Sequence, residues 1–287
     1  MKRNGKIMGV IIGLFLAAGF LLSGLAKTEA GTNPPLKATL FKVGKADATV
    51  IQTDGHTMVI DAGEEEDGEE IVDFLRNQGI SRVDVLVITH FDRDHVGGAD
   101  TLVESMEIGE VHLPAYQGGN TEYTDFMRAL ENKGIKPKLL TQPVELMLGT
   151  AKVVTEPPLS YENDGGVAEI DNNFSLITTI MHGENVLLFT GDAEKQRTRE
   201  WLSGKDKQDC DFLKMPHHGV YHTALKELLE AVMPEYAVIC SSGKNPADPE
   251  TLELLKNYGI STFQTKDGNV TVISDGKNLE VHQALEY

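Results

Sequence analysis

The chain has 287 residues, an apolar content of 40% and a formal net charge of −18. A chain of this length can form one large core, and no shift in composition marks an internal boundary. A surface this acidic repels phosphate backbones and excludes a strong nucleic-acid-binding surface, so bound cations would have to offset the repulsion of any phosphodiester.

Residues 1–30 differ from the rest of the chain. Lys2, Arg3 and Lys6 precede an uncharged run over residues 7–26 that ends in small residues, a pattern typical of an export signal. A run of about 18 to 20 residues is also long enough for a membrane anchor. A cleaved signal peptide and a retained anchor therefore both stay open. Either one predicts a secreted or membrane-anchored protein that acts outside the cytoplasm and meets the membrane only through this segment.

From Leu36 onward, short apolar runs alternate with helical patterns, which predicts sheets covered by helices in an α/β (α+β) fold. We expect strands over residues 36–43, 48–53, 57–61, 83–89, 175–180, 186–190, 211–215, 235–240 and 269–274. We expect helices over residues 71–79, 98–106, 121–132, 194–202, 224–232 and 249–258. An Asp-Gly turn at residues 54–55 joins the second and third strands in a meander. The acidic run over residues 64–70 is interpreted as a solvated loop leading into the first helix.

The two cysteines and four scattered histidines lie outside the main motif. Cys210 and Cys240 are the only cysteines and lie in apolar runs, which favours buried free thiols over a disulfide. Four scattered histidines are expected near turns or strand ends, facing solvent: His56, His112, His182 and His282.

The segment THFDRDHVGG holds His90, Asp92, Asp94 and His95 within six residues at the end of a predicted strand. The chance of such a match is about one in a thousand at this chain's composition. Imidazole nitrogens with carboxylate oxygens suit Zn²⁺ best, and Mn²⁺ or Fe²⁺ as alternatives. Alternation along the chain directs His90 and Asp92 to one centre and Asp94 and His95 to a second. A polar turn that only caps the next helix is the structural alternative.

Three other places in the chain, one before and two after this segment, supply the further ligands and supporting groups that a two-metal site needs. Asp61 ends the predicted strand before an Ala-Gly pair, where a carboxylate can orient metal-ligand imidazoles. Asp192 ends another strand and can bridge two cations. His217 and His218 are adjacent imidazoles at the end of a third strand, and His222 lies four residues further, close enough for a proton donor or substrate contact.

Four segments, VIDAG, THFDRDHVGG, LLFTGDA and PHHG, stand in an order that resembles the metallo-β-lactamase superfamily. More narrowly, LFKVGKADATVIQTDGHTMVIDAG, DNNFSLITTI, LLFTGDAEKQRTREW and DFLKMPHHGVYHTAL resemble the hydrolase domain of the ComEC/Rec2 competence proteins, over residues 36–274. The resemblance implies that residues 36–287 form an αββα sandwich. Its two mixed sheets would be flanked by helices, with the metal site at the edge between the sheets.

The resemblance also implies roles for individual residues. His90 and Asp92 would hold one metal ion with the help of His217 or His218, and a second ion would be held nearby. The remaining implied residues are the ligands Asp94, His95 and the bridging Asp192, the supporting Asp61 and Asp47, and the catalytic set Asp94, His217 and His222.

This sequence departs from the family pattern at three places. The loop over residues 43–47 has a changed sequence but keeps Asp47. Asp171 and Asn172 lie where other branches place a metal-binding histidine, and Asp248 stands where a histidine is usual. Whether Asp248 binds metal is left open.

The function implied by this resemblance is a metal-dependent phosphodiesterase or nuclease-type hydrolase that uses a metal-bridging hydroxide. Its partner would be a small phosphodiester or nucleic-acid-like substrate. The alternatives are a thioesterase or lactonase, a β-lactam hydrolase, and a non-catalytic metal-binding module. Asp92 replaces the histidine usual in the superfamily and weighs against the thioesterase.

Overall fold

The computed structural model describes residues 34–162, 171–203 and 209–284. The predicted signal peptide or anchor at residues 1–30 lies outside these ranges and stays a prediction. Within them, no helix combines the length and apolar character needed to cross a bilayer.

The first sheet has eight strands in the order β15-β14-β1-β2-β3-β4-β5-β6. Their bounds are β1 (Leu36–Leu40), β2 (Ala48–Thr53), β3 (His56–Ala62), β4 (Arg82–Val87), β5 (Glu107–Pro114), β6 (Lys138–Leu140), β14 (Val270–Ser274) and β15 (Leu279–Gln283). β14, β15 and β1 to β3 pair antiparallel, whereas β3 to β6 pair in parallel.

The second sheet has seven strands in the order β13-β12-β11-β10-β9-β8-β7. Their bounds are β7 (Val144–Leu148), β8 (Ala151–Glu156), β9 (Ile177–His182), β10 (Asn185–Phe189), β11 (Phe212–Lys214), β12 (Tyr236–Ile239) and β13 (Ser261–Gln264). β7 to β10 pair antiparallel and β10 to β13 in parallel, so both sheets are mixed.

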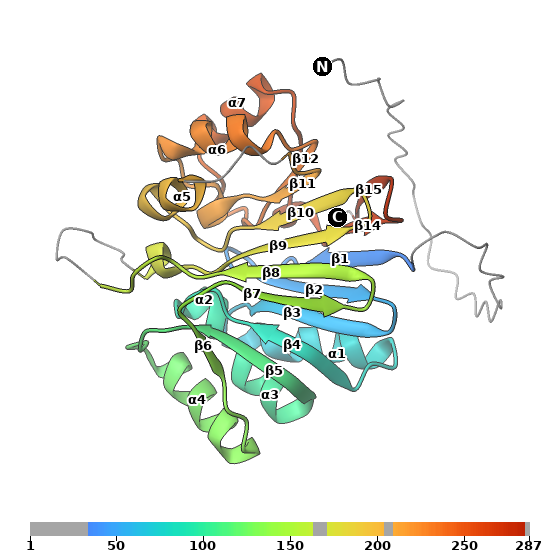
Figure 1. Ribbon diagram of the computed structural model, residues 1–287, viewed down its shortest axis with the longest axis vertical. Helices are drawn as coiled ribbons and strands as arrows, with labels where there is room; N and C mark the ends of the chain where they lie inside the picture. Colours follow the sequence, from blue (N-terminus) through green and yellow to red (C-terminus); the bar gives the residue numbers. More distant parts are fainter. Residues whose placement is uncertain (1–33, 163–170, 204–208, 285–287) are drawn as a thin grey trace. The chain divides into compact units, whose positions relative to one another are not determined.

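Helices lie on the outer faces of the two sheets (Figure 1). α1 (Gly68–Asn77), α3 (Ala99–Ser105) and α4 (Thr121–Lys133) cover the first sheet, and their apolar faces share one buried cluster with its strands. α5 (Lys195–Leu202), α6 (Ala224–Val232) and α7 (Pro249–Asn257) cover the second sheet through another cluster. A third cluster joins the inner faces of the two sheets. The predicted αββα sandwich is confirmed.

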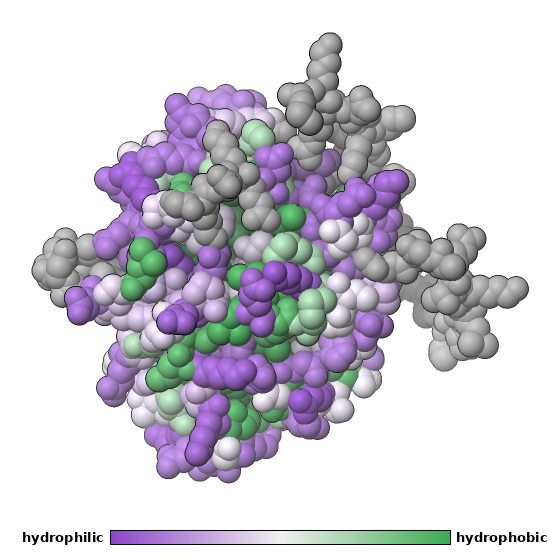
Figure 2. Space-filling view, viewed as in Figure 1, coloured by the Kyte–Doolittle hydropathy of each residue, from purple (hydrophilic) through white to green (hydrophobic). Residues whose placement is uncertain are grey.

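Burial explains the periodicity of these elements. In α1, Ile71, Val72 and Leu75 are buried while Glu69 and Glu70 face solvent, which is the pattern of an amphipathic surface helix. The acidic run before it forms a short exposed turn, η1 (Glu65–Asp67), as predicted. Most of the face drawn in Figure 2 is hydrophilic, with apolar residues gathered across its middle.

Most predicted elements occur within three residues of the predicted limits, and some strands were not predicted. The Asp54-Gly55 turn forms with φ of 50° and 76°, and Thr53 pairs with His56 across it. The unpredicted strands are β5, β6, β7, β8, β13 and β15. β6 and β13 are very short and pair with strands that lie more than 20 residues earlier in the chain, whereas β7 with β8 and β14 with β15 form local hairpins that the sequence pattern did not reveal.

The expectations for the cysteines and scattered histidines had different outcomes. Cys210 and Cys240 are buried free thiols, as predicted. His56 and His282 are exposed, as predicted. The expectation was wrong for His112 and His182, which are fully buried. His112 lies inside β5 between β4 and β6, and His182 ends β9 with its Nδ1 2.8 Å from Ser274 Oγ, so neither side chain reaches solvent.

Candidate metal centre

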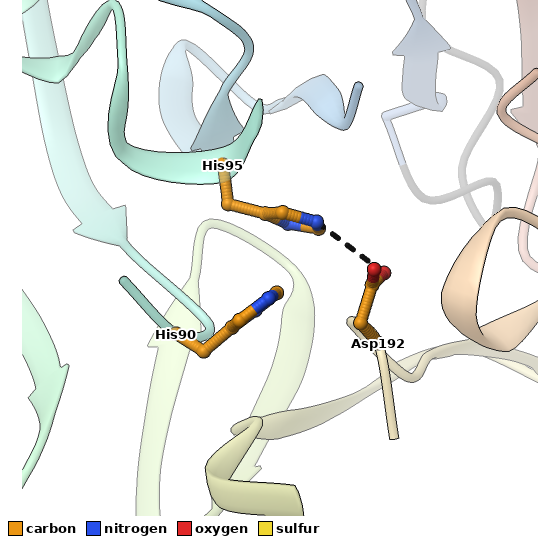
Figure 3. A group of neighbouring side chains, drawn as sticks. All are labelled: His90, His95 and Asp192. Atoms are coloured by element: carbon orange, nitrogen blue, oxygen red, sulfur yellow. Dashed lines mark ion pairs between the residues drawn. The ribbon is translucent and has the colours of Figure 1, made fainter. Parts of the chain in front are cut away.

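Loops from both sheets meet at one edge of the sandwich. β4 leads through Thr89 to His90, and the short helix α2 (Arg93–Val96) carries Asp94 and His95. From the second sheet, β10 leads to Asp192, and β11 leads to the turn η3 (Pro216–Gly219). Figure 3 shows His90, His95 and Asp192 pointing toward one another from these separate segments.

Backbone contacts join these segments. The Leu176 N–H donates to the Thr89 carbonyl at 2.9 Å, and the His217 N–H donates to the Gly191 carbonyl at 3.3 Å. Gly98 packs so closely on Ala62 that a Cβ there would lie 2.5 Å from the Ala62 carbonyl oxygen. The glycine after the motif therefore allows the chain to turn back close to the site.

Asp61 orients the two imidazoles of the first motif. Its carboxylate accepts from the Thr89 N–H at 2.7 Å, from the Thr89 hydroxyl at 2.8 Å, and lies 2.8 Å from His95 Nδ1. Because the Thr89 hydroxyl donates to Asp61, its oxygen is left to accept from His90 Nδ1 at 3.1 Å. Both Nδ1 atoms therefore act as donors, and both Nε2 atoms are left as the possible metal ligands.

His218 repeats this arrangement from the second sheet. Its Nδ1 lies 3.1 Å from the Cys240 carbonyl oxygen, which only accepts, so its Nε2 is likewise left as the possible metal ligand. The Nε2 atoms of His90, His95 and His218 are all buried and have no hydrogen bond of good geometry. Three imidazoles held at Nδ1 and free at Nε2 are what a metal site requires.

Asp192 lies between the imidazoles of the two sheets. Its Oδ1 is 3.3 Å from His95 Nε2, and its Oδ2 is 3.0 Å from His218 Nε2. Asp94 Oδ2 approaches His218 Nε2 to 3.3 Å. Ligand atoms within 4.8 Å of one another thus form two adjoining groups, His90–His95–Asp192 and Asp94–His95–His218. The buried Nε2 atoms and the Asp192 Oδ1 atom make ion pairs but no hydrogen bonds, and this set of donors fits divalent cations.

Strained backbone accompanies the site. Asp61, His217 and His218 have φ of 57°, 46° and 52°, in the left-handed region that non-glycine residues rarely adopt. Gly191 has φ of 52°, and a Cβ there would lie 2.9 Å from the Thr89 Cβ. Such backbone is costly and persists where surrounding contacts fix it, which is common at functional sites.

The carboxylates hold positive charge at the site. Burial alone would lower the pKa of His95, but Asp192 and Asp61 raise it well above the ordinary value. Burial opposes the charged form of His218 in the same way, and Asp192, Asp94 and Asp47 still raise its pKa to about 9. Conversely, burial would raise the pKa of Asp192, but His218 and His95 lower it. In the metal-free protein, imidazolium groups therefore balance the carboxylates that would bind cations.

A buried lysine was missed from the sequence. Lys214, the last residue of β11, forms ion pairs with Asp47 Oδ2 and, at 3.5 Å, with Asp192 Oδ1. Burial would lower the pKa of Lys214, but Asp47 and Asp192 raise it. A charged residue inside the apolar run DFLKM was the available signal, since a lysine is almost never fully buried without a partner.

The loop after β5 holds the metal-binding motif and was also missed. The Phe91 N–H donates to Tyr116 Oη at 2.9 Å, and Asn120 Nδ2 donates to the Phe91 carbonyl at 2.6 Å. Phe91 lies between His90 and Asp92, so these two bonds fix the peptide that joins two motif residues. No local pattern marks Tyr116, because its partner is 25 residues away.

The other predicted residues lie at the rim. The Asp92 side chain is 45% exposed, with Oδ2 3.6 Å from His90 Nε2. Among the described residues, the ligand groups join His90 with His95 and Asp192, and none of them includes Asp92. Asp171 is close enough to Asp92 and His90 to feel their charge, and burial raises its pKa.

His217 and His218 have different surroundings. His217 Nδ1 lies 3.3 Å from Glu194 Oε1, and its Nε2 lies 3.5 Å from Asn172 Nδ2. His217 belongs to none of the ligand groups found among the described residues. His222 is close to His217, and burial lowers the pKa of His222 to about 4.

Asp248 is engaged elsewhere. Its Oδ2 accepts from the Tyr221 N–H at 2.7 Å, and its own N–H donates to the Gly219 carbonyl at 3.1 Å. Asp248 therefore stabilises the segment that follows the histidine pair through these two hydrogen bonds. It is not part of any ligand group in the described ranges.

The fold and this geometry define a metal-dependent hydrolase architecture, and comparison with known proteins specifies the class. Residues 42–244 match the Metallo-beta-lactamase superfamily, and the chain belongs to this superfamily. Similar solved structures include the metallo-beta-lactamase fold protein YhfI from Bacillus subtilis, with a TM-score of 0.54, 9% identity, and coverage of 86% of this chain and 100% of YhfI. Tm1679, described as a metal-dependent hydrolase of the beta-lactamase superfamily, has a TM-score of 0.53, 11% identity, and coverage of 80% and 95%. At these identities, the likeness concerns the fold alone.

Relatives at higher identity confirm the narrower resemblance. ComE operon protein 3 of Bacillus subtilis (strain 168) is 27% identical over 216 residues, which cover 74% of this chain and 27% of that protein. Recombination protein 2 of Haemophilus influenzae is 27% identical over 265 residues, which cover 88% and 31%. Competence protein ComA of Neisseria gonorrhoeae is 26% identical over 268 residues, which cover 88% and 35%. The chain thus spans roughly a quarter to a third of the length of these curated relatives.

Proposed function

We propose that the protein is a phosphodiester hydrolase that uses two divalent cations, Zn²⁺ most readily, with Mn²⁺ or Fe²⁺ as alternatives. The observation that carries this proposal is the pair of adjoining ligand groups, His90–His95–Asp192 and Asp94–His95–His218. Two cations held side by side supply Lewis-acid activation of water and neutralise the oxygens of a phosphodiester.

The chain's own residues account for orientation and proton transfer. Thr89 and Asp61 fix the ring orientations of His90 and His95, and Asp192 joins the two groups from one strand end. Glu194 faces His217 Nδ1, so the His217 Nε2 atom is the position from which a proton can be accepted or returned. Among the described residues, His218 belongs to a ligand group and His217 to none, which supports metal binding by His218 and proton transfer by His217.

His222 is the second proton carrier in this proposal. Its pKa of about 4 makes the imidazole neutral at pH 7, so one nitrogen donates while the other accepts. Asp94 belongs to a ligand group and also faces His218, so its proposed contribution is to bind a cation and orient substrate.

The substrate proposed is a small phosphodiester or a nucleic-acid-like molecule. The relatives named recombination protein 2 and competence protein ComA support phosphodiester chemistry. The net charge of −18 favours short substrates over long polyanions, because a net acidic chain repels a phosphate backbone. We also propose that the protein acts outside the cytoplasm, secreted or anchored through residues 1–30, on the basis of the export-signal pattern.

Metal analysis combined with a substrate panel tests this function. The purified protein, refolded with Zn²⁺ or Mn²⁺, is expected to bind up to two ions and to hydrolyse bis(p-nitrophenyl) phosphate. His90→Ala and Asp192→Ala should abolish turnover, whereas His217→Gln should retain metal and lose roughly 10² to 10⁴-fold in rate.

The panel also includes a thioester, a lactone and a β-lactam. Faster cleavage of one of these would replace the phosphodiester as substrate class and leave the metal centre intact. Bound metal without turnover on any member would indicate a non-catalytic metal-binding module. Absence of metal after refolding would refute the metal centre itself.

A further inference from the structure

Lys214 lies inside a group of side chains that could hold a third cation. Asp47, Asp192 and His218 form another set whose ligand atoms all lie within 4.8 Å of one another, and all three are buried. The Lys214 ammonium contacts both carboxylates of this set, at Asp47 Oδ2 and Asp192 Oδ1. It also donates to the Gly191 carbonyl at 2.9 Å. The positively charged Lys214 ammonium therefore occupies the position at which these carboxylates would otherwise bind a metal ion.

The surroundings of the Lys214 ammonium favour its charged form. The Lys214 side chain is 3% exposed, its ammonium donates to the Gly191 carbonyl, and it forms ion pairs with the carboxylates of Asp47 and Asp192. An ammonium has no lone pair, so Lys214 cannot be a metal ligand. A neighbouring divalent cation would be repelled by it at close range and low dielectric.

We propose that Lys214 is an internal cation that replaces a metal ion at the Asp47 corner of the site. It confines metal to the two groups that contain His90, His95, Asp94 and His218, and it holds Asp192 between them. Asp47 is then the counter-ion of Lys214 and not a metal ligand. This inference rests on the metal centre of the proposed function and adds a residue that sets how many cations the centre accepts.

Removal of the lysine charge tests the proposal. Full-length wild type, Lys214→Met and Arg197→Met are stripped of metal, dialysed against increasing Mn²⁺ and analysed for bound Mn²⁺ per chain. Arg197 is a matched control because it is also buried and paired with a carboxylate, Glu200, outside the ligand groups. Lys214→Met is expected to bind one more Mn²⁺ ion than wild type, and Arg197→Met no more than wild type.

Thermal melting gives a second measurement that does not depend on activity. In EDTA, Lys214→Met should melt below wild type, because Asp47 and Asp192 lose their buried partner. Added Mn²⁺ should raise its melting temperature more than that of wild type. The double variant Asp47→Asn with Lys214→Met should return to the wild-type number of ions, since the extra position loses a carboxylate.

The outcomes are distinct. Equal Mn²⁺ binding and equal Mn²⁺-induced stabilisation in wild type and Lys214→Met would overturn the proposal. If Lys214→Met folds only when Mn²⁺ is present, the ion has taken the place of the ammonium and the proposal stands. If it does not fold even with Mn²⁺, replacement by a metal ion fails and the proposal falls. If the wild-type protein binds no metal, the proposed function itself is refuted, and this inference falls with it.

Discussion

Buried histidines occur at two ends of the sandwich, and their surroundings differ. At the metal centre, His95 and His218 face carboxylates that raise their pKa values. His182 ends β9 at the far end, where its Nδ1 lies 2.8 Å from Ser274 Oγ and burial lowers its pKa. Its Nε2 is buried without a hydrogen bond, like those at the centre. Burial and an unpaired nitrogen therefore do not identify a ligand, whereas convergence with other ligand atoms does.

Replacement of one histidine at each end should give the largest difference in metal content and activity. His218→Ala is expected to lose at least one bound ion and at least about 10²-fold in activity, because both ligand and charge partner disappear. His182→Ala should keep full metal content and lose roughly 1 to 3 kcal/mol of unfolding free energy. Elemental analysis and urea unfolding measure these effects. Equal metal loss in both variants would contradict the distinction between the two ends.

A pair of glycines extends the comparison to the backbone. Gly191→Ala places a Cβ against Thr89 at φ of 52°, and Gly183→Ala places one against the Gly276 carbonyl at φ of 60°. Each should lower stability by roughly 1 to 3 kcal/mol. Only Gly191→Ala should also weaken metal binding, since it displaces Asp192. Competition with a chromophoric chelator measures the affinity, and weakened binding in Gly183→Ala would argue against a local effect.

The pH dependence of the metal-free protein should differ between the two ends. The His218 pKa is raised from 6.5 to about 9, so its stabilising contribution is complete below pH 6.5 and is lost as pH rises toward 9. The His182 pKa is lowered, so its contribution is present above pH 6.5 and is lost on acidification. Melting temperatures in EDTA should therefore fall on both sides of neutrality.

Two variants separate the acidic and the alkaline part of this pH dependence. His218→Gln should make the alkaline fall in melting temperature shallower, with the remainder due to His95, whose pKa is also raised. His182→Gln should make the acidic fall shallower, with a contribution left from His222, whose pKa is also lowered. An alkaline fall unchanged in His218→Gln would show that another group produces it. Metal affinity should rise with pH over the same alkaline range, because protons leave the nitrogens that bind the ion.

The smallest effect is expected at His112, a buried histidine outside both of these places. Its Nε2 lies 3.2 Å from the half-exposed Glu110 Oε2, which also pairs with Lys138 at 2.7 Å. Glu110→Gln should cost less than about 1 kcal/mol, since solvent screens exposed pairs. Metal content should not change. Chemical denaturation would detect a larger loss, which would mean that the pair is more important than its exposure indicates.

The sequence was most informative where chemistry is local. His90, Asp92, Asp94 and His95 follow one another within six residues, and the apolar strand before them fixes the sheet edge at which they lie. The αββα sandwich followed from the same segments and their resemblance to a known superfamily. Strand β6 was missed because it has three residues and pairs with β5, about 25 residues earlier, and His182 was misplaced because Ser274, 92 residues away, lies against it.

The sequence alone determined which residue types are available for a metal centre and in what order they occur, because ligand spacing within a loop is a local property. Only the tertiary structure decided their grouping. It placed His218 beside Asp192 and Asp94, kept Asp92 at the rim and set Asp248 against the Tyr221 amide. It also brought Lys214 to Asp47 across 167 residues of chain. A buried charge needs a partner, and that partner is chosen by the packing of two sheets, which no local pattern encodes.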